Sequence, residues 1–146
     1  MTIYYRTADV VRATGTPPNR LQRYLERNYI TMQPCDVASE GLGHKRGFSF
    51  RRVVQVAITS ELIKIGISPS RAAKAAFAFS DTGGSGRSPC RLYALGKTFL
   101  VGVGTKHLIL NQQPDQSLNE LIPQGQAAFV IDLGQIVAGI QTKLEK

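Results

Sequence analysis

The sequence predicts an α+β protein in three parts: a helix-rich part over residues 1–80, a Gly/Ser-rich linker over residues 81–89, and a small sheet-plus-helix unit over residues 90–146. The positive charge is concentrated in the helix-rich part. Residues 1–80 contain 12 Lys and Arg and 5 Asp and Glu, whereas residues 81–146 contain 6 Lys and Arg and 5 Asp and Glu. The apolar pattern also changes, from helical spacing to short runs between glycine turns. A net charge of +8 on 146 residues favours a polyanionic partner.

Two short helices joined by a turn are predicted near the N-terminus. The first spans residues 7–13, with Thr7 as its cap. Three of its side chains are expected to face inward: Ala8, Val10 and Val11. Gly15 makes the turn, and Pro17 and Pro18 suit the start of a second helix, where a missing N–H group costs nothing.

The second helix runs to Asn28 and has two contrasting sides. Its apolar side consists of Leu21, Tyr24 and Leu25. Its polar side consists of Asn19, Gln22, Arg23 and Glu26, flanked by Arg20 and Arg27. Two short helices, a Gly-containing turn and an Arg/Asn/Gln side on the second helix describe a helix-turn-helix. The alternative is a surface helix whose charges only face water.

A β-hairpin, or wing, is predicted after this pair. Residues 31–33 and 44–48 are its two strands, and the turn-rich residues 34–43 connect them. The basic tip consists of His44, Lys45 and Arg46, which suits contact with a phosphate backbone.

Two further helices complete the first part. The third begins at the cap Ser49, and the fourth begins at Ser68 with Pro69 at its first position. The third carries an apolar stripe of Val53, Val54, Ala57, Ile58, Leu62 and Ile65. Arg51 and Arg52 stand in its first turn, where the helix dipole disfavours cations. Phosphate contact and plain solvent exposure both account for them.

The last part is predicted to combine short strands with one helix. The strands span residues 91–95, 98–103, 107–110 and 127–131, with one helical turn over residues 117–122. Asp132 caps a final helix with five apolar side chains on one face: Leu133, Ile136, Val137, Ile140 and Leu144. A unit of this size is marginal alone. Its apolar face is therefore expected either to form a dimer interface or to pack on the helix-rich part.

Several positions in residues 4–77 match one known pattern. They are Ala8, Val11, Gly15, Pro18, Leu21, Tyr24, Tyr29, Ile30, Arg46, Phe48, Ala57, Ile58, Ile65, Gly66 and Ile67. This half of the chain resembles the winged helix-turn-helix domain of the MerR family of bacterial transcription regulators, which implies four helices and a β-hairpin wing. The chain departs from the family at Gln22, where Arg is usual, at Leu25, where Glu is usual, and at Asn28, where Gly is usual. The family's long dimerising helix is missing.

The resemblance and the polar side of the second helix together predict sequence-specific binding of double-stranded DNA. Asn19, Arg20, Gln22 and Arg23 are expected to face the major groove, where Arg reads guanine and Asn or Gln reads adenine. The side chains expected to hold phosphates are Tyr24, Lys45, Arg46 and Arg51. Two further expected DNA contacts are Thr16 and His44.

The predicted role is that of a transcription regulator that binds an inverted repeat as a homodimer through residues 90–146. The resemblance also implies contact with RNA polymerase. One alternative is a phage or mobile-element DNA-binding protein, since the winged domains of recombination directionality factors and small terminase subunits resemble this one. Another is a protein-interaction adaptor whose basic face binds an acidic protein.

No catalytic site, metal site or cofactor is predicted. His44 and His107 have no Cys, Asp or Glu at metal-ligand spacing, and the acidic residues are scattered. Cys35 and Cys90 do not make a disulfide framework. Because no signal peptide and no apolar run of membrane-spanning length is visible, a cytoplasmic, nucleoid-associated location is expected, with no membrane partner.

Overall fold

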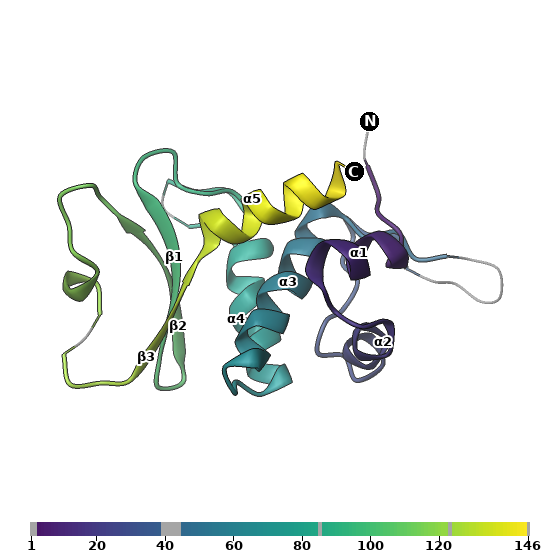
Figure 1. The fold of residues 1–146 in the computed structure, drawn as a ribbon, viewed down its shortest axis with the longest axis horizontal. Coiled ribbons are helices and arrows are strands. Elements are labelled where there is room, and N and C mark those ends of the chain that lie inside the picture. The colour runs from purple at the N-terminus through teal and green to yellow at the C-terminus, as the bar shows by residue number, and fades with distance from the viewer. Residues whose placement is uncertain (1–2, 39–44, 85, 123, 146) are drawn as a thin grey trace.

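The computed structural model describes residues 3–38, 45–84, 86–122 and 124–145. Within these ranges the chain forms five α-helices, one 3₁₀ turn and one three-stranded sheet (Figure 1). The helices are α1 (Thr7–Thr14), α2 (Pro18–Glu26), α3 (Phe50–Lys64), α4 (Pro69–Ser80) and α5 (Leu133–Leu144). The strands are β1 (Lys97–Val103), β2 (Lys106–Gln112) and β3 (Ala128–Asp132), and the 3₁₀ turn is Leu118–Glu120. The predicted α+β class is confirmed.

Helices and sheet share one hydrophobic core around α3. This helix packs against α1 and α4, and α5 leaves the sheet and crosses α3 to reach α1 (Figure 1). The core cluster includes four side chains with no exposed surface, one each from α1, α3, β1 and α5: Val10, Ile58, Leu100 and Leu133. The C-terminal unit therefore packs on the helix-rich part, which is the second of the two expectations for it.

The structure of the first helix differs from the prediction in two respects. Its N-cap is Arg6 rather than Thr7, because the Asp9 carboxylate accepts a hydrogen bond from the Arg6 amide at 3.0 Å. Ala8, expected to face inward, is exposed, whereas Val10 is fully buried. The buried face of α1 is therefore narrower than the apolar spacing of the sequence indicates.

Left-handed residues and a proline set the limits of α2, as predicted. Gly15 makes the preceding turn with a φ of 70°, which glycine reaches without strain. Pro18 occupies the first helical position. Beyond the last turn Asn28 has a φ of 58°, which Asn tolerates better than most residues.

The caps of α3 and α4 are also confirmed. The Ser49 hydroxyl accepts a hydrogen bond from the Arg52 amide, and the Ser68 hydroxyl accepts one from the Arg71 amide. The α4 residues that pack closely are mostly small: Ala72, Ala73, Ala75 and Ala76. Ile65, expected in the apolar stripe of α3, is 60% exposed because it follows the last helical residue.

The predicted hairpin is wrong in its first strand. Residues 31–33 pair with nothing in the described part of residues 44–48. Two isolated antiparallel bridges are present instead: Val37 with Gly47, and Tyr5 with Phe48. The Asp36 carboxylate explains the change, because it accepts a hydrogen bond from the Gln33 amide at 2.8 Å and closes a turn there. The predicted tip residue His44 lies outside the described residues.

The sheet has β1 at its centre, in the order β2-β1-β3, with both pairings antiparallel. The three strands, their hairpin turn at residues 104–105 and the 3₁₀ turn all stand where the sequence predicts them. The predicted strand over residues 91–95 is wrong. This segment is a loop. Its Tyr93 amide donates a hydrogen bond to the Thr98 hydroxyl at 2.8 Å, so the amide binds a side chain instead of the backbone of a neighbouring strand.

The segment expected to be a flexible linker is held to the body of the protein. Arg87 is only 7% exposed. Its guanidinium donates hydrogen bonds to five backbone carbonyls: those of Ala78, Phe79, Thr82, Ser88 and Arg91. Two of these belong to the last turn of α4, where a cation is favoured by the helix dipole. Arg87 thus fixes the path from α4 towards β1.

The apolar face of α5 is covered within the chain. Leu133, Val137 and Ile140 are buried, and the helix contacts α1, α3 and β1. Asp132 caps it as predicted, accepting a hydrogen bond from the Gln135 amide at 3.2 Å. Because this face is occupied, it no longer supports the expected homodimer through residues 90–146, which stays a prediction.

Candidate nucleic-acid interface

The second helix presents a row of polar side chains to solvent. The four residues expected to read bases are all exposed: Asn19, Arg20, Gln22 and Arg23. The helical period places Leu21 and Tyr24 on the other side, where they are 1% and 2% exposed. The α2 helix thus rests on the core by its apolar side and carries donors and acceptors on its outer side.

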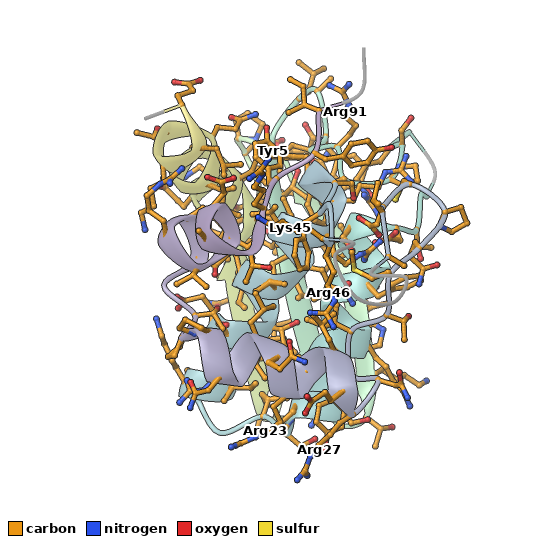
Figure 2. All side chains as sticks on the ribbon, turned by 90° about the vertical axis from the view of Figure 1, so that its right-hand side faces the viewer. Tyr5, Arg23, Arg27, Lys45, Arg46 and Arg91 are labelled. Atoms are coloured by element: carbon orange, nitrogen blue, oxygen red, sulfur yellow. The ribbon has the colours of Figure 1, made fainter. Side chains whose placement is uncertain are left out.

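The segment at residues 45–46 lies against this row. The Arg46 guanidinium donates a hydrogen bond to the Gln22 side-chain carbonyl at 3.0 Å, and the Gln22 amide nitrogen donates one to Glu26 at 2.9 Å. Figure 2 shows Lys45 and Arg46 on the same side of the molecule as Arg23 and Arg27. We call the combined surface the basic face; it consists of Asn19, Arg20, Gln22, Arg23, Arg27, Lys45 and Arg46.

The basic face carries five cationic side chains beside a single carboxylate, that of Glu26. Among the residues that the structure describes, ion pairs join only three cations to carboxylates: Arg12, Arg52 and Lys64. None of these belongs to the basic face. Its positive charge is therefore not neutralised by close carboxylates, and it attracts polyanions.

Two of the predicted contact residues point into the protein instead. Thr16 is 1% exposed, and its hydroxyl lies 2.6 Å from the Ser60 hydroxyl of α3. Tyr24 is also buried, and its hydroxyl has no hydrogen-bond partner among the described residues. The expected phosphate contact of Tyr24 and the expected DNA contact of Thr16 are corrected accordingly. Both side chains support α2 from behind.

A third predicted residue, Arg51, belongs to a different surface. It lines a cavity together with Cys90 and Arg91, and no residue of α2 lines that cavity. His44, the remaining predicted residue, lies outside the described ranges. Conversely, Arg27 extends the exposed row of α2 and was left out of the predicted contacts, although its spacing of four residues from Arg23 indicated the same side of the helix.

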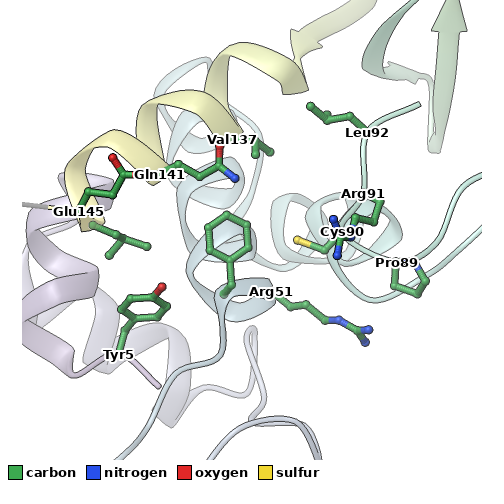
Figure 3. Close-up of a pocket in the computed structure, with 11 residues that line it drawn as sticks. Tyr5, Arg51, Pro89, Cys90, Arg91, Leu92, Val137, Gln141 and Glu145 are labelled. Carbon is green, nitrogen blue, oxygen red and sulfur yellow. The ribbon is translucent and has the colours of Figure 1, made fainter. Parts of the chain in front are cut away.

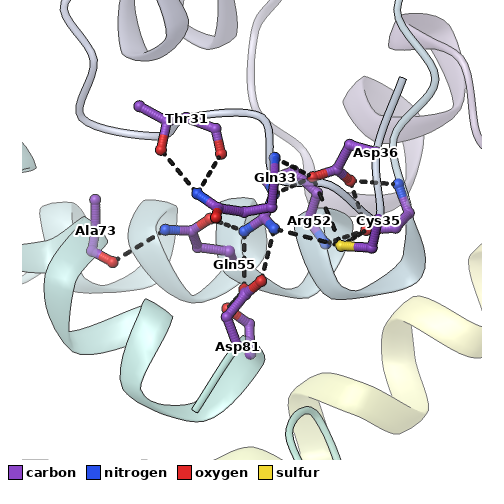
Figure 4. Close-up of polar contacts among 10 residues, drawn as sticks. Thr31, Gln33, Cys35, Asp36, Arg52, Gln55, Ala73 and Asp81 are labelled. Carbon is purple, nitrogen blue, oxygen red and sulfur yellow. Dashed lines mark hydrogen bonds and ion pairs between the residues drawn. The ribbon is translucent and has the colours of Figure 1, made fainter. Parts of the chain in front are cut away.

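A buried ionic network holds residues 33–36 against α3 (Figure 4). The Arg52 guanidinium binds Asp36 at 2.9 Å and Asp81 at 2.8 Å. It also donates to the Gln55 side chain. The side chains of Arg52 and Asp36 have no exposed surface. Burial opposes the charge on Arg52, but the hydrogen bonds that its guanidinium donates to Asp81 and the charges of both carboxylates raise its pKa.

The same network sets the ionisation of Asp36. Burial alone would raise its pKa, but hydrogen bonds from the Ser49 hydroxyl and from the Gln33 and Ser49 amides, together with the charge of Arg52, lower it below the ordinary 3.8. The Arg52 charge thus supports the turn at residues 33–36. Nothing in the local sequence indicates this partnership, because Arg52 stands beside the equally basic Arg51.

We expect a pH-dependent stability from Asp36. Its pKa is lower in the folded than in the unfolded chain, so its stabilising contribution is full above about pH 4 and is lost as pH falls through the folded pKa. Urea unfolding between pH 6 and about pH 2.5 measures this. Asp36→Asn is expected to be less stable at neutral pH and to lose less stability on acidification. Parallel pH profiles for the two proteins would contradict the assignment.

No three His, Cys, Asp or Glu side chains gather into a metal-binding group within the described ranges. None of the described helices is long and apolar enough to span a bilayer. Compared with known proteins, the chain matches no protein-family model and no curated protein significantly.

Proposed function

We propose that the protein binds double-stranded DNA in a sequence-specific way, with α2 as its recognition helix, and that it acts as a binding protein rather than an enzyme. The observation that carries the proposal is the basic face. It joins an exposed Arg/Asn/Gln row on one short helix to a second basic segment through the Arg46–Gln22 hydrogen bond. The major groove admits an α-helix, and these side chains match the hydrogen-bonding edges of bases.

The position of each side chain suggests a division of roles. Arg23 and Asn19 lie in the middle of the exposed side of α2, where base edges would be nearest. Gln22 is at one edge, held by Arg46 and Glu26. Arg20 and Arg27 border the other edge, next to buried Tyr24. We assign base readout to the middle pair and phosphate contact to the bordering cations, together with exposed Lys45.

The first test is Arg23→Ala. A preferred duplex is selected from a random pool with the full chain, and fluorescence anisotropy then measures binding to it and to a random duplex. Removing a bidentate base contact is expected to weaken binding to the preferred duplex by about 1–3 kcal/mol and to relax preference at one base pair. Lys106→Ala is the matched control, since Lys106 is exposed and belongs to β2, a strand of the sheet that lies on the other side of α3 and α4 from α2 (Figure 1). An equal loss on both duplexes would remove Arg23 from base readout.

Lys45 and Arg46 are expected to behave differently from each other. Lys45→Ala should weaken binding to all duplexes alike and reduce the slope of log affinity against log salt by about one. Arg46→Ala should also release Gln22, so we expect a change in base preference as well as in the slope. Salt titrations of both variants on the preferred and random duplexes measure this. Identical behaviour of the two variants would show that the Arg46–Gln22 contact has no role in recognition.

We further propose that this binding regulates transcription. Mapping the bound sites across the genome tests this, because a regulator's sites lie at promoters, whereas those of a recombination or packaging protein lie at attachment or packaging sites. Sedimentation of the chain with and without its duplex measures whether one or two copies bind, which checks the predicted homodimer.

A further inference from the structure

A cavity of about 730 Å³ lies beside the N-terminal end of α3, and none of the residues that line it belongs to the basic face. Its walls come from four separate stretches of chain: the segment before α1, the first turn of α3, the loop at residues 89–92 and the last turns of α5 (Figure 3). This volume lies within the range of small-molecule sites. The packing of α5 on α1 and α3 creates it, so the sequence pattern alone could not indicate it.

The two sides of the cavity differ in charge. Arg51 and Arg91 lie on one side, and Gln141 and Glu145 lie on the other (Figure 3). In the described part of the chain, neither Arg51 nor Arg91 has a carboxylate within 4.0 Å. Two guanidinium groups that form no ion pair in the described part of the chain therefore border the same cavity. Each guanidinium group offers paired N–H donors that suit the oxygens of a carboxylate, sulfonate or phosphate.

Apolar surface lies between these polar sides. The cavity is lined by two aromatic residues, Tyr5 and Phe50, and by the aliphatic residues Leu92, Val137 and Leu144. Tyr5, Phe50 and Leu144 are partly buried against the core, so their positions are fixed by packing. A flat apolar group would cover this surface and remove it from water.

The one thiol in the cavity wall stays neutral. Burial raises the pKa of Cys90 to about 12, and the charge of Asp81 adds to this, although Arg51, Arg52 and Arg87 act in the opposite direction. A protonated thiol is a poor nucleophile. It also places no negative charge beside Arg51 and Arg91 that would compete with an anionic ligand.

We propose that this cavity is a binding site for a small organic anion with a flat apolar body, such as an arene carboxylate or sulfonate. The anionic group binds Arg51 and Arg91, and the ring lies against Tyr5 and Phe50. The end of the ligand near Gln141 and Glu145 is uncharged or carries hydrogen-bond donors, because Glu145 repels a second anion. This binding is independent of the proposed contact with DNA.

Naphthalenesulfonate serves as the probe, with titration calorimetry on the full chain. We expect one molecule to bind per chain. Naphthol, which lacks the anion, and methanesulfonate, which lacks the ring, should each bind at least about tenfold more weakly. Amide chemical-shift changes in nuclear magnetic resonance spectra should concentrate at Tyr5, Arg51 and residues 90–92.

Variants then separate the site from general attraction to a basic protein. Arg51→Gln and Arg91→Gln should each weaken naphthalenesulfonate binding about tenfold, and Lys106→Gln, which removes an equal charge elsewhere, should leave it unchanged. Thermal unfolding of each variant checks that the fold is intact. No binding at millimolar probe, equal affinity for naphthol, or equal losses in all three variants would overturn the proposal.

Discussion

Replacing Arg52 by Met is expected to lower the free energy of unfolding by about 3–5 kcal/mol, the largest effect of any single substitution considered. Met keeps the apolar stem but leaves Asp36 and Asp81 without their cation. Because the Asp36 side chain is fully buried and the Asp81 side chain is 7% exposed, water cannot replace the guanidinium. Urea unfolding at neutral pH, followed by circular dichroism, measures the loss.

The chain offers a matched control at its surface. Lys64 forms an ion pair with Glu61 at 2.9 Å, but its side chain is 63% exposed, so Lys64→Met is expected to change stability by no more than about 1 kcal/mol. Adding Asp36→Asn and Asp81→Asn to Arg52→Met should recover part of the loss, because the uncompensated charges are removed. If Arg52→Met costs no more than Lys64→Met, the network does not hold residues 33–36 against α3.

The second large effect is expected from cutting the chain. A fragment of residues 1–82 should fail to fold cooperatively, because it lacks α5. Leu133, Val137 and Ile140 of that helix are buried where it packs on α1, α3 and β1, and burial of each contributes about 1.5–3 kcal/mol. The sum is comparable to the whole stability of an ordinary domain. The three-part organisation that the sequence predicts, with a linker over residues 81–89, favours the opposite result, a fragment that folds alone.

Circular dichroism and urea titration of the fragment beside the full chain test this. A gradual, non-cooperative loss of helical signal in the fragment is the expected result. Mixing in a peptide of residues 128–146 provides a further check, because its helix should restore part of the cooperativity if packing is the cause. A fragment that unfolds as sharply and at the same urea concentration as the full chain would show that the helix-rich part is an independent domain.

The features that the sequence predicted correctly depend on chemistry between near neighbours. Ser49, Ser68 and Asp132 each cap a helix by accepting a hydrogen bond from an amide three residues on. Pro18 begins α2 and Asn28 lies just beyond its end, each through its own backbone preference. The outward polar side of α2 follows from the helical period, which likewise needs no knowledge of the rest of the chain.

The features that sequence could not predict depend on distant partners. The sequence around Arg52 is that of a surface cation in a basic helical turn. Its side chain is buried because it binds the carboxylates of Asp36 and Asp81, which lie 16 and 29 positions away in the sequence. The hydroxyl group of Tyr24 favours a phosphate contact, but an amphipathic side chain is compatible with the surface and with the protein interior. In the structure Tyr24 lies on the buried side of α2. The cavity at Arg51 arises only when α5 packs across α3.

We propose above all that the basic face reads a DNA sequence. The most direct test is the affinity of the full chain for a duplex selected from a random pool, compared with a shuffled duplex of the same composition, across a salt series. We predict at least about a thousandfold preference for the selected duplex and a linear fall of log affinity with log salt. Arg23→Ala should reduce the preference, and Lys106→Ala should not. Equal affinity for both duplexes at every salt concentration, or selection that enriches no sequence, would contradict the claim.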